Sequence, residues 1–224
     1  MIIYGAVISP YVRKVHLAAR EKGIDYTVVP AGPGSQDPGF LAASPFAKIP
    51  AIRDGDFTLA DSSAIVAWMD AHWPTPALIP AEAEARGRTI WFDEFSDTLL
   101  MASGGKILRH RLIGPRLGLP CVEAIAQEGV DELPRCYAYL EGEAARANAG
   151  SGWLVGETLT LADIAVATAI RSLDYVAATP DAALYPATAT WLARVHARPG
   201  WQAVDAHEAQ VVAALGLRAP APVE

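Results

Sequence analysis

The chain has 224 residues, of which 52% are hydrophobic and 19% are charged, and its formal net charge is −7 at pH 7. This length can bury a sizeable core, and the acidic balance argues against non-specific nucleic-acid binding, for which a basic surface is expected. No apolar run is long enough to cross a bilayer, and the first eight residues lack the basic start and length of a signal peptide. We expect a soluble cytoplasmic protein without membrane or nucleic-acid partners.

The first third of the chain predicts a mixture of strands and helices. In chain order we expect a strand at 2–4, a helix at 10–22, a strand at 26–29, a hairpin with strands at 51–53 and 57–59, and a helix at 62–72. This βαβ-ββα order is that of a thioredoxin-like domain. In the first helix, Val12, Val15 and Ala19 form an inner face by their helical spacing, so we expect Arg13 and Lys14 to remain in solvent.

Ser9 lies at the junction between the first predicted strand and the first predicted helix. Serine is a good N-cap, and Pro10 suits the first helical position, where its missing N–H costs nothing. The free N–H groups and the positive end of the helix dipole then face whatever Ser9 contacts. This position therefore favours a bound anion or thiolate.

Two further motifs indicate a site for a short peptide. Ile49-Pro50 precedes the hairpin, and we expect its peptide bond to be cis, which forms a tight corner that exposes the backbone N–H and C=O of Ile49. Asp61 and Ser62 stand at the start of the next helix, where backbone N–H groups and a hydroxyl can bind a carboxylate and the Asp61 side chain can meet an ammonium. Together with Ser9, these motifs fit a peptide that carries a thiol and an amino-acid-like end.

The order and spacing of the three motifs resemble the glutathione transferase superfamily, in particular its bacterial and plant-like members with a serine in a Ser-Pro-aromatic motif. The resemblance implies that Ser9 activates the glutathione thiolate and that the backbone of Ile49, before Pro50, pairs with the cysteinyl part. It also implies that Lys48 holds the glycyl carboxylate, and that Asp61 with Ser62 holds the γ-glutamyl end.

The turn-rich segment 31–39 departs from the family pattern. We expect it to be irregular and to form one wall of the peptide site. Many relatives carry a lysine or histidine in this wall, but this segment has no basic residue, which leaves Lys48 to act alone. His16 stands where relatives often have arginine, and we interpret it as structural or solvated.

The second part of the chain predicts a helical bundle after a proline-rich linker at 74–80. We expect a thioredoxin-like domain at 1–73 and an all-helical domain at 81–224, with helices near 82–109, 121–148, 161–178, 187–198 and 201–215. Thr160 and Asp163 form a capping box. Cys121 and Cys136 have no metal or redox spacing, so we expect reduced thiols and no metal site.

The electrophile is expected to bind where the helical half faces Ser9. The resemblance points to the first long helix and the segment after it, and the candidate residues there are Trp91, Phe95, Leu99, Met101, Arg109 and His110. Apolar residues at helical spacing also form cores, and the run 109–111 also reads as a solvated charge cluster.

The sequence therefore predicts a glutathione transferase that adds the glutathione sulfur to a small hydrophobic electrophile. One alternative is a glutathione-dependent thiol transferase or peroxidase. Ser9 argues against this alternative, because thiol-exchanging relatives have cysteine at that position. The other is a transferase-like interaction module without turnover. The resemblance also implies a homodimer, for which Trp68, Met69, Trp91 and Phe92 are the expected interface residues.

Overall fold

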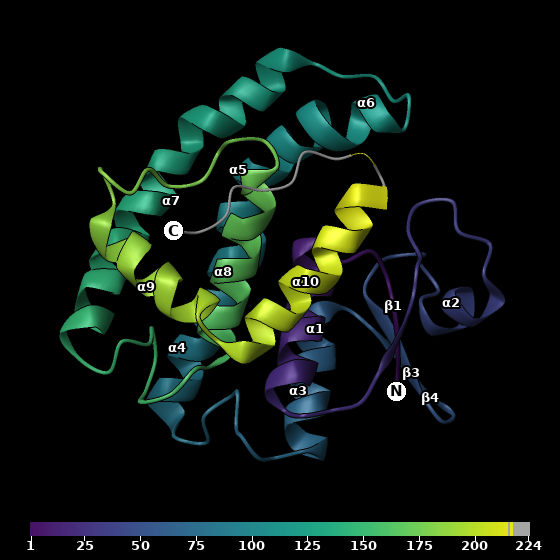
Figure 1. Cartoon of the computed structure of the whole chain (residues 1–224), viewed down its shortest axis with the longest axis horizontal. Helices are drawn as coiled ribbons and strands as arrows, with labels where there is room; N and C mark the ends of the chain where they lie inside the picture. The colour runs from purple at the N-terminus through teal and green to yellow at the C-terminus, as the bar shows by residue number, and fades with distance from the viewer. Residues whose placement is uncertain (215, 217–224) are drawn as a thin grey trace.

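The computed structural model describes residues 1–214 and 216 and contains one four-stranded sheet beside a larger helical half (Figure 1). The strands are β1 (Ile2–Tyr4), β2 (Thr27–Val29), β3 (Ala51–Asp54) and β4 (Phe57–Ala60), in the order β2-β1-β3-β4. β1 runs parallel to β2, with Ile3 opposite Val28, and antiparallel to β3, with Ile3 opposite Ile52. With α1 (Pro10–Glu21) and α3 (Ser62–His72), this arrangement confirms the predicted thioredoxin-like fold.

The segment before β3 contains a short helix that the sequence analysis did not predict, α2 (Pro38–Ala43). The side chain of Asp37 caps it by accepting a hydrogen bond from the Phe40 N–H at 2.7 Å, and Pro38 occupies its first turn. Phe40 is fully buried. The prediction that the whole of 31–39 is irregular is therefore wrong at its last two residues, because a cap and a buried aromatic outweigh the turn-forming composition.

The helical half begins after the segment that follows α3. The long helix predicted at 82–109 is a continuous succession of α4 (Ala83–Glu94), a π-helical turn η1 (Phe95–Leu100), α5 (Met101–Ile107), a second π-helical turn η2 (Leu108–Ile113) and α6 (Gly114–Arg116). Then come α7 (Glu123–Ala149), α8 (Leu161–Asp174), α9 (Pro186–His196) and α10 (Pro199–Ala214). Residue 215 of the last predicted helix lies outside the described residues.

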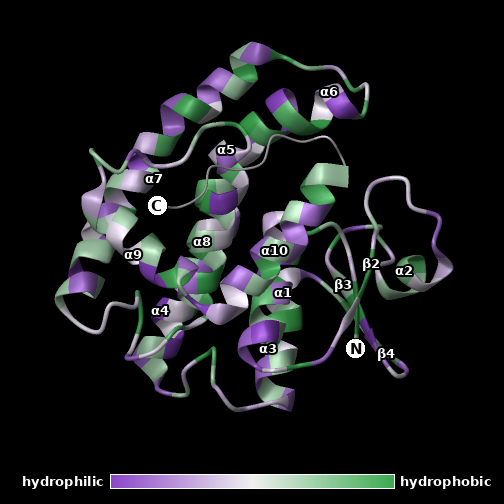
Figure 2. Cartoon of the chain, in the orientation of Figure 1, coloured by the Kyte–Doolittle hydropathy of each residue, from purple (hydrophilic) through white to green (hydrophobic). Residues whose placement is uncertain are grey.

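The core of the helical half is centred on α8. Nearly all of its side chains are buried, whereas α7 alternates hydrophobic and hydrophilic patches along its length (Figure 2). Asp163 confirms the predicted capping box: it accepts hydrogen bonds from the N–H groups of Thr160 and Leu154, both at 3.0 Å, and from the indole of Trp191 at 2.8 Å. None of the described helices has the length and apolarity to span a membrane.

Helix α1 lies between the sheet and the helical half and carries two buried cations. Arg13 and Lys14 are 0% and 1% exposed, so the prediction that they remain in solvent is wrong. Arg13 pairs with Glu208 of α10, and Lys14 pairs with Asp93 of α4 and Asp97 of η1 at 2.6 and 2.7 Å. Because each cation meets a carboxylate from the helical half, ion pairs replace water at this junction.

Candidate functional site

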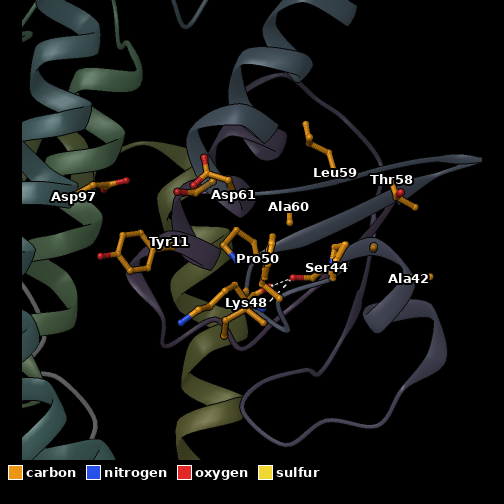
Figure 3. A pocket seen from close by; sticks show the side chains of 15 residues that line it. Tyr11, Ala42, Ser44, Lys48, Pro50, Thr58, Leu59, Ala60, Asp61 and Asp97 are labelled. Carbon is orange, nitrogen blue, oxygen red and sulfur yellow. Dashed lines mark hydrogen bonds between the residues drawn. The ribbon is translucent and has the colours of Figure 1, made fainter.

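A cavity of about 710 Å³ lies at the edge of the sheet and is closed on one side by the helical half. Its walls come from Tyr11 at the start of α1, the segments 42–46 and 48–50, the strand β4, Asp61 and Ser62 at the start of α3, and Asp97 of η1 (Figure 3). The structure therefore brings Lys48, Ile49, Pro50, Asp61 and Ser62 together around one space. The segment predicted as a wall, 31–39, does not line the cavity, and the end of α2 takes its place.

The corner of the cavity is built by the segment that leads into β3. The Ser44 hydroxyl donates a hydrogen bond to the Lys48 carbonyl at 2.7 Å and accepts one from the Lys48 N–H at 2.9 Å. The Ile49–Pro50 bond is cis, as predicted. The carbonyl of Pro50 accepts a hydrogen bond from the Asp61 N–H at 3.3 Å, which ties the corner to the start of α3. Lys48 itself is exposed, so its ammonium is free to meet an anion.

Asp61 holds an unusual backbone conformation beside this corner. Its φ is +85°, a region that non-glycine residues adopt at a cost of about 1–3 kcal/mol and that clusters at functional sites. One carboxylate oxygen caps α3 by accepting hydrogen bonds from the N–H groups of Ser63 and Ala64, each at 3.0 Å. The second oxygen has no protein partner among the described residues and remains available to a ligand.

Asp97 adds a second carboxylate from the opposite wall. One of its oxygens accepts a hydrogen bond from the Lys14 ammonium at 2.7 Å, and the same ammonium reaches Asp93 at 2.6 Å. Burial raises the pKa of the Asp97 carboxyl, an effect that the nearby Lys14 limits. The sequence analysis missed Asp97, although its spacing from Asp93 already placed both carboxylates on one face of a helix.

Ser9 is the N-cap residue of α1, with an extended backbone at φ −72° and ψ 131°. Its hydroxyl makes no hydrogen bond to any described residue, so it is available to a ligand. Ser9 does not line the cavity as delimited above, whereas Tyr11, two residues further along, does. The predicted catalytic serine thus stands two residues before a lining residue of the cavity, at the positive end of the α1 dipole.

The residues predicted for the electrophile lie elsewhere. Trp91, Phe95 and Leu99 line a second groove of about 690 Å³ between α4, η1 and α7, which shares no lining residue with the first cavity. Met101 is buried in the core at 8% exposure. In the first half of η2, Arg109 donates a hydrogen bond to the Pro120 carbonyl at 3.4 Å and His110 accepts one from the Val122 N–H at 3.3 Å. The structure does not bring these six residues together with Lys48 and Asp61.

His16 is structural rather than solvated. It is 1% exposed, and its ring lies 5.1 Å from that of Tyr26 and stacks on His207 at 6.0 Å. Burial lowers the pKa of His16 to about 3, with His207, Arg13 and Arg20 adding to the effect. The imidazole is therefore neutral in the folded protein at ordinary pH and takes no part in the cavity.

Comparison with known proteins identifies the family. The model for the glutathione S-transferase N-terminal domain matches residues 3–77, and that for the C-terminal domain matches residues 109–199. Glutathione S-transferase 3 of Zea mays is 30% identical over 97% of this chain and 96% of its own length. The chain belongs to the glutathione S-transferase family.

Solved structures agree with this assignment over most of the chain. A glutathione S-transferase from Rhodospirillum rubrum superposes with a TM-score of 0.81 at 25% identity, covering 91% of this chain and 90% of its own. Glutathione S-transferase-I, solved with lactoylglutathione bound, gives a TM-score of 0.79 at 26% identity and covers 92% and 98% of the two chains.

Proposed function

We propose that the protein is an enzyme that conjugates glutathione, through its sulfur, to a small hydrophobic electrophile. The observation that carries this proposal is that one cavity, in a chain of this family, is lined by the corner at Pro50, the start of α3 and Asp97. The bound lactoylglutathione in a structure of similar fold supports a glutathione-type ligand for this cavity.

Each part of glutathione has a partner in this proposal. The backbone of Ile49 pairs with the cysteinyl residue, the exposed Lys48 meets the glycyl carboxylate, and the N–H groups at Ser62 meet the γ-glutamyl carboxylate. The free oxygen of Asp61 and the carboxylate of Asp97 approach the γ-glutamyl ammonium from two walls of the cavity. Opposite charges are thereby matched at both ends of the tripeptide.

Ser9 is proposed as the group that stabilises the thiolate. A hydroxyl hydrogen bond and the positive end of α1 both favour the charged sulfur, which lowers the thiol pKa and populates the nucleophile near neutral pH.

The proposal has three further parts. The chain divides into two domains at 1–73 and 81–224, the protein is cytoplasmic, and its activity needs no metal ion.

Replacing Ser9 by alanine tests the assignment. A hydrogen bond to a charged group is worth about 1.5–3 kcal/mol, so Ser9→Ala should lower kcat/KM for conjugation by roughly 10- to 100-fold. The expected affinity for glutathione changes much less, because Lys48, Asp61 and Asp97 remain. Ser63→Ala, which removes a serine hydroxyl from the first turn of α3, is the matched control. Full activity of Ser9→Ala would show that another group activates the sulfur.

We also propose that the protein forms a homodimer. Trp91 is 45% exposed and Leu99 is 46% exposed beside the second groove, and burying these side chains against a partner would be favourable. Met69 and Phe92 are fully buried in the core of the chain, so they cannot contact a second subunit as expected. Trp68 is half-buried and stacks on Phe57 at 4.9 Å.

Light scattering decides the assembly state. The expected mass is about twice the 23.7 kDa of one chain. Trp91→Glu is expected to shift the population to monomers while the circular dichroism spectrum stays unchanged. A parent mass of one chain would contradict the dimer.

A further inference from the structure

The peptide unit between Ile8 and Ser9 is held from two sides. Its N–H donates a hydrogen bond to the Ala6 carbonyl at 2.9 Å, in the turn after β1, and its C=O accepts one from the Ser172 hydroxyl of α8 at 3.3 Å. Among the described residues, no other group donates to this carbonyl. Because a peptide unit is planar, the two hydrogen bonds together fix the direction in which the chain enters Ser9.

The Ser172 hydroxyl has one place for its proton. The side chain is 1% exposed and accepts a hydrogen bond from the Arg13 guanidinium at 3.3 Å. Two carbonyls lie within reach of the proton, that of Ile8 at 3.3 Å and that of Thr168 at 3.2 Å. The Thr168 carbonyl already accepts a hydrogen bond from Arg13 at 3.4 Å and one from the N–H four residues later in α8, which fills both of its lone pairs. The proton therefore goes to the Ile8 carbonyl.

Arg13 ties the other side of Ser9 to the same cluster. Its backbone N–H donates a hydrogen bond to the Ser9 carbonyl at 2.9 Å, and its side chain is fully buried and paired with Glu208. The peptide units before and after Ser9 are thus both connected to buried groups. The Ser9 hydroxyl has no hydrogen bond to a described residue, so its position is set by the backbone on either side.

We propose that Ser172 is a positioning residue for the serine that activates the sulfur: by binding the Ile8 carbonyl, it keeps the Ser9 hydroxyl directed at glutathione. This inference rests on the proposed conjugation and on the role of Ser9 in it. Ser172 does not line the cavity, so it acts through the backbone of Ser9 and not on the ligand. A catalytic group that is displaced by about 1 Å can lose on the order of 100-fold in rate, and without Ser172 the peptide unit is free to rotate.

The test compares Ser172→Ala with Thr168→Val. Thr168 is also 1% exposed and lies one turn earlier on α8, but its hydroxyl donates to the Ala165 carbonyl at 3.0 Å within the helix. Thr168→Val therefore removes a buried hydroxyl without touching the Ile8 carbonyl, and it is expected to match the parent.

Ser172→Ala is expected to lower kcat/KM for the conjugation of benzyl chloride by about 10-fold. It should also raise the pKa of the bound glutathione thiol by about one pH unit. The Kd for glutathione should change by less than about twofold, because the residues proposed to bind the tripeptide lie on other segments. Ser172→Thr, which retains the hydroxyl, should restore the thiol pKa.

A double variant shows whether Ser172 acts through Ser9. If it does, Ser9→Ala combined with Ser172→Ala has the same kcat/KM as Ser9→Ala alone, because a misplaced hydroxyl and a missing one are equivalent. Losses that multiply in the double variant would overturn the inference, since they would mean that Ser172 acts on something other than Ser9.

The remaining outcomes separate this inference from the proposed function. Parent values of kcat/KM and thiol pKa in Ser172→Ala, or equal losses in Ser172→Ala and Thr168→Val, would reject the positioning role while the conjugation stands. A parent that does not bind glutathione would reject the proposed function itself. Should Ser172→Ala not fold, Ser172→Cys, whose thiol is a weaker donor of similar size, takes its place with the same expected directions.

Discussion

Replacing Glu208 by alanine is expected to lower the free energy of unfolding by about 3–5 kcal/mol, because it leaves a buried arginine without its counter-charge. Glu208 and Arg13 are both 0% exposed and pair directly between α10 and α1. The Glu208 carboxylate also accepts a hydrogen bond from the Tyr175 hydroxyl and lies 3.4 Å from the Arg171 guanidinium. Urea unfolding followed by circular dichroism measures the change.

Glu143 provides the matched control for this substitution. It too is buried, at 6% exposure, and pairs with two arginines, but Arg88 and Arg146 have exposed side chains and return to water when the carboxylate is removed. Glu143→Ala is therefore expected to cost only about 1 kcal/mol. A double replacement of Arg13 by Met and Glu208 by Leu should recover most of the loss. If Glu208→Ala lowers the free energy of unfolding no more than Glu143→Ala does, the fold does not depend on the pairing of Arg13 with Glu208.

Lowering the pH from 7 to 5 is expected to remove about 4 kcal/mol of stability through two histidines. Burial lowers the pKa of His16 from 6.5 to about 3 and that of His196 from 6.5 to about 4. As the pH falls below 6.5, these two histidines bind protons in the unfolded chain but not in the folded chain. Each histidine contributes its stabilisation fully above pH 6.5 and has lost about 2 kcal/mol of it at pH 5.

The histidine contribution is isolated by comparing the parent with a variant that carries His16→Gln and His196→Phe. Burial raises the pKa of Asp163 and of Asp205, which acts in the opposite direction at lower pH but is common to both proteins. The double variant should show a much flatter loss of unfolding free energy between pH 7 and 5. His72→Gln, at an exposed histidine, should keep the parent slope. Parallel slopes for the parent and the double variant would contradict the account.

Local signals predicted the elements of the sheet half well. The helix at 62–72 has the predicted bounds because Asp61 is a strong N-cap, and the hairpin follows from the turn residues between β3 and β4. The missed helix α2 also carried local signals, since Asp37 and Pro38 are a cap and a first-turn proline. Its short length and the glycines and prolines before it obscured them.

Long-range partners explain the errors. Arg13 and Lys14 looked solvated because Glu208 and Asp93 lie far along the chain, and a helical pattern does not reveal a distant carboxylate. Similarly, periodicity placed Phe95 and Leu99 on one face of a helix but did not say which face meets the cavity. Asp97, on the opposite face, is the residue that reaches it.

The central claim, that this cavity binds glutathione and activates its thiol, is tested most directly by titrating the thiol of glutathione bound to the protein through the ultraviolet absorbance of the thiolate. The account predicts a thiol pKa lowered from about 8.5 to roughly 6–7 in the complex, and a higher value in Ser9→Ala. A bound thiol that titrates like the free one, or glutathione that does not bind, would contradict it.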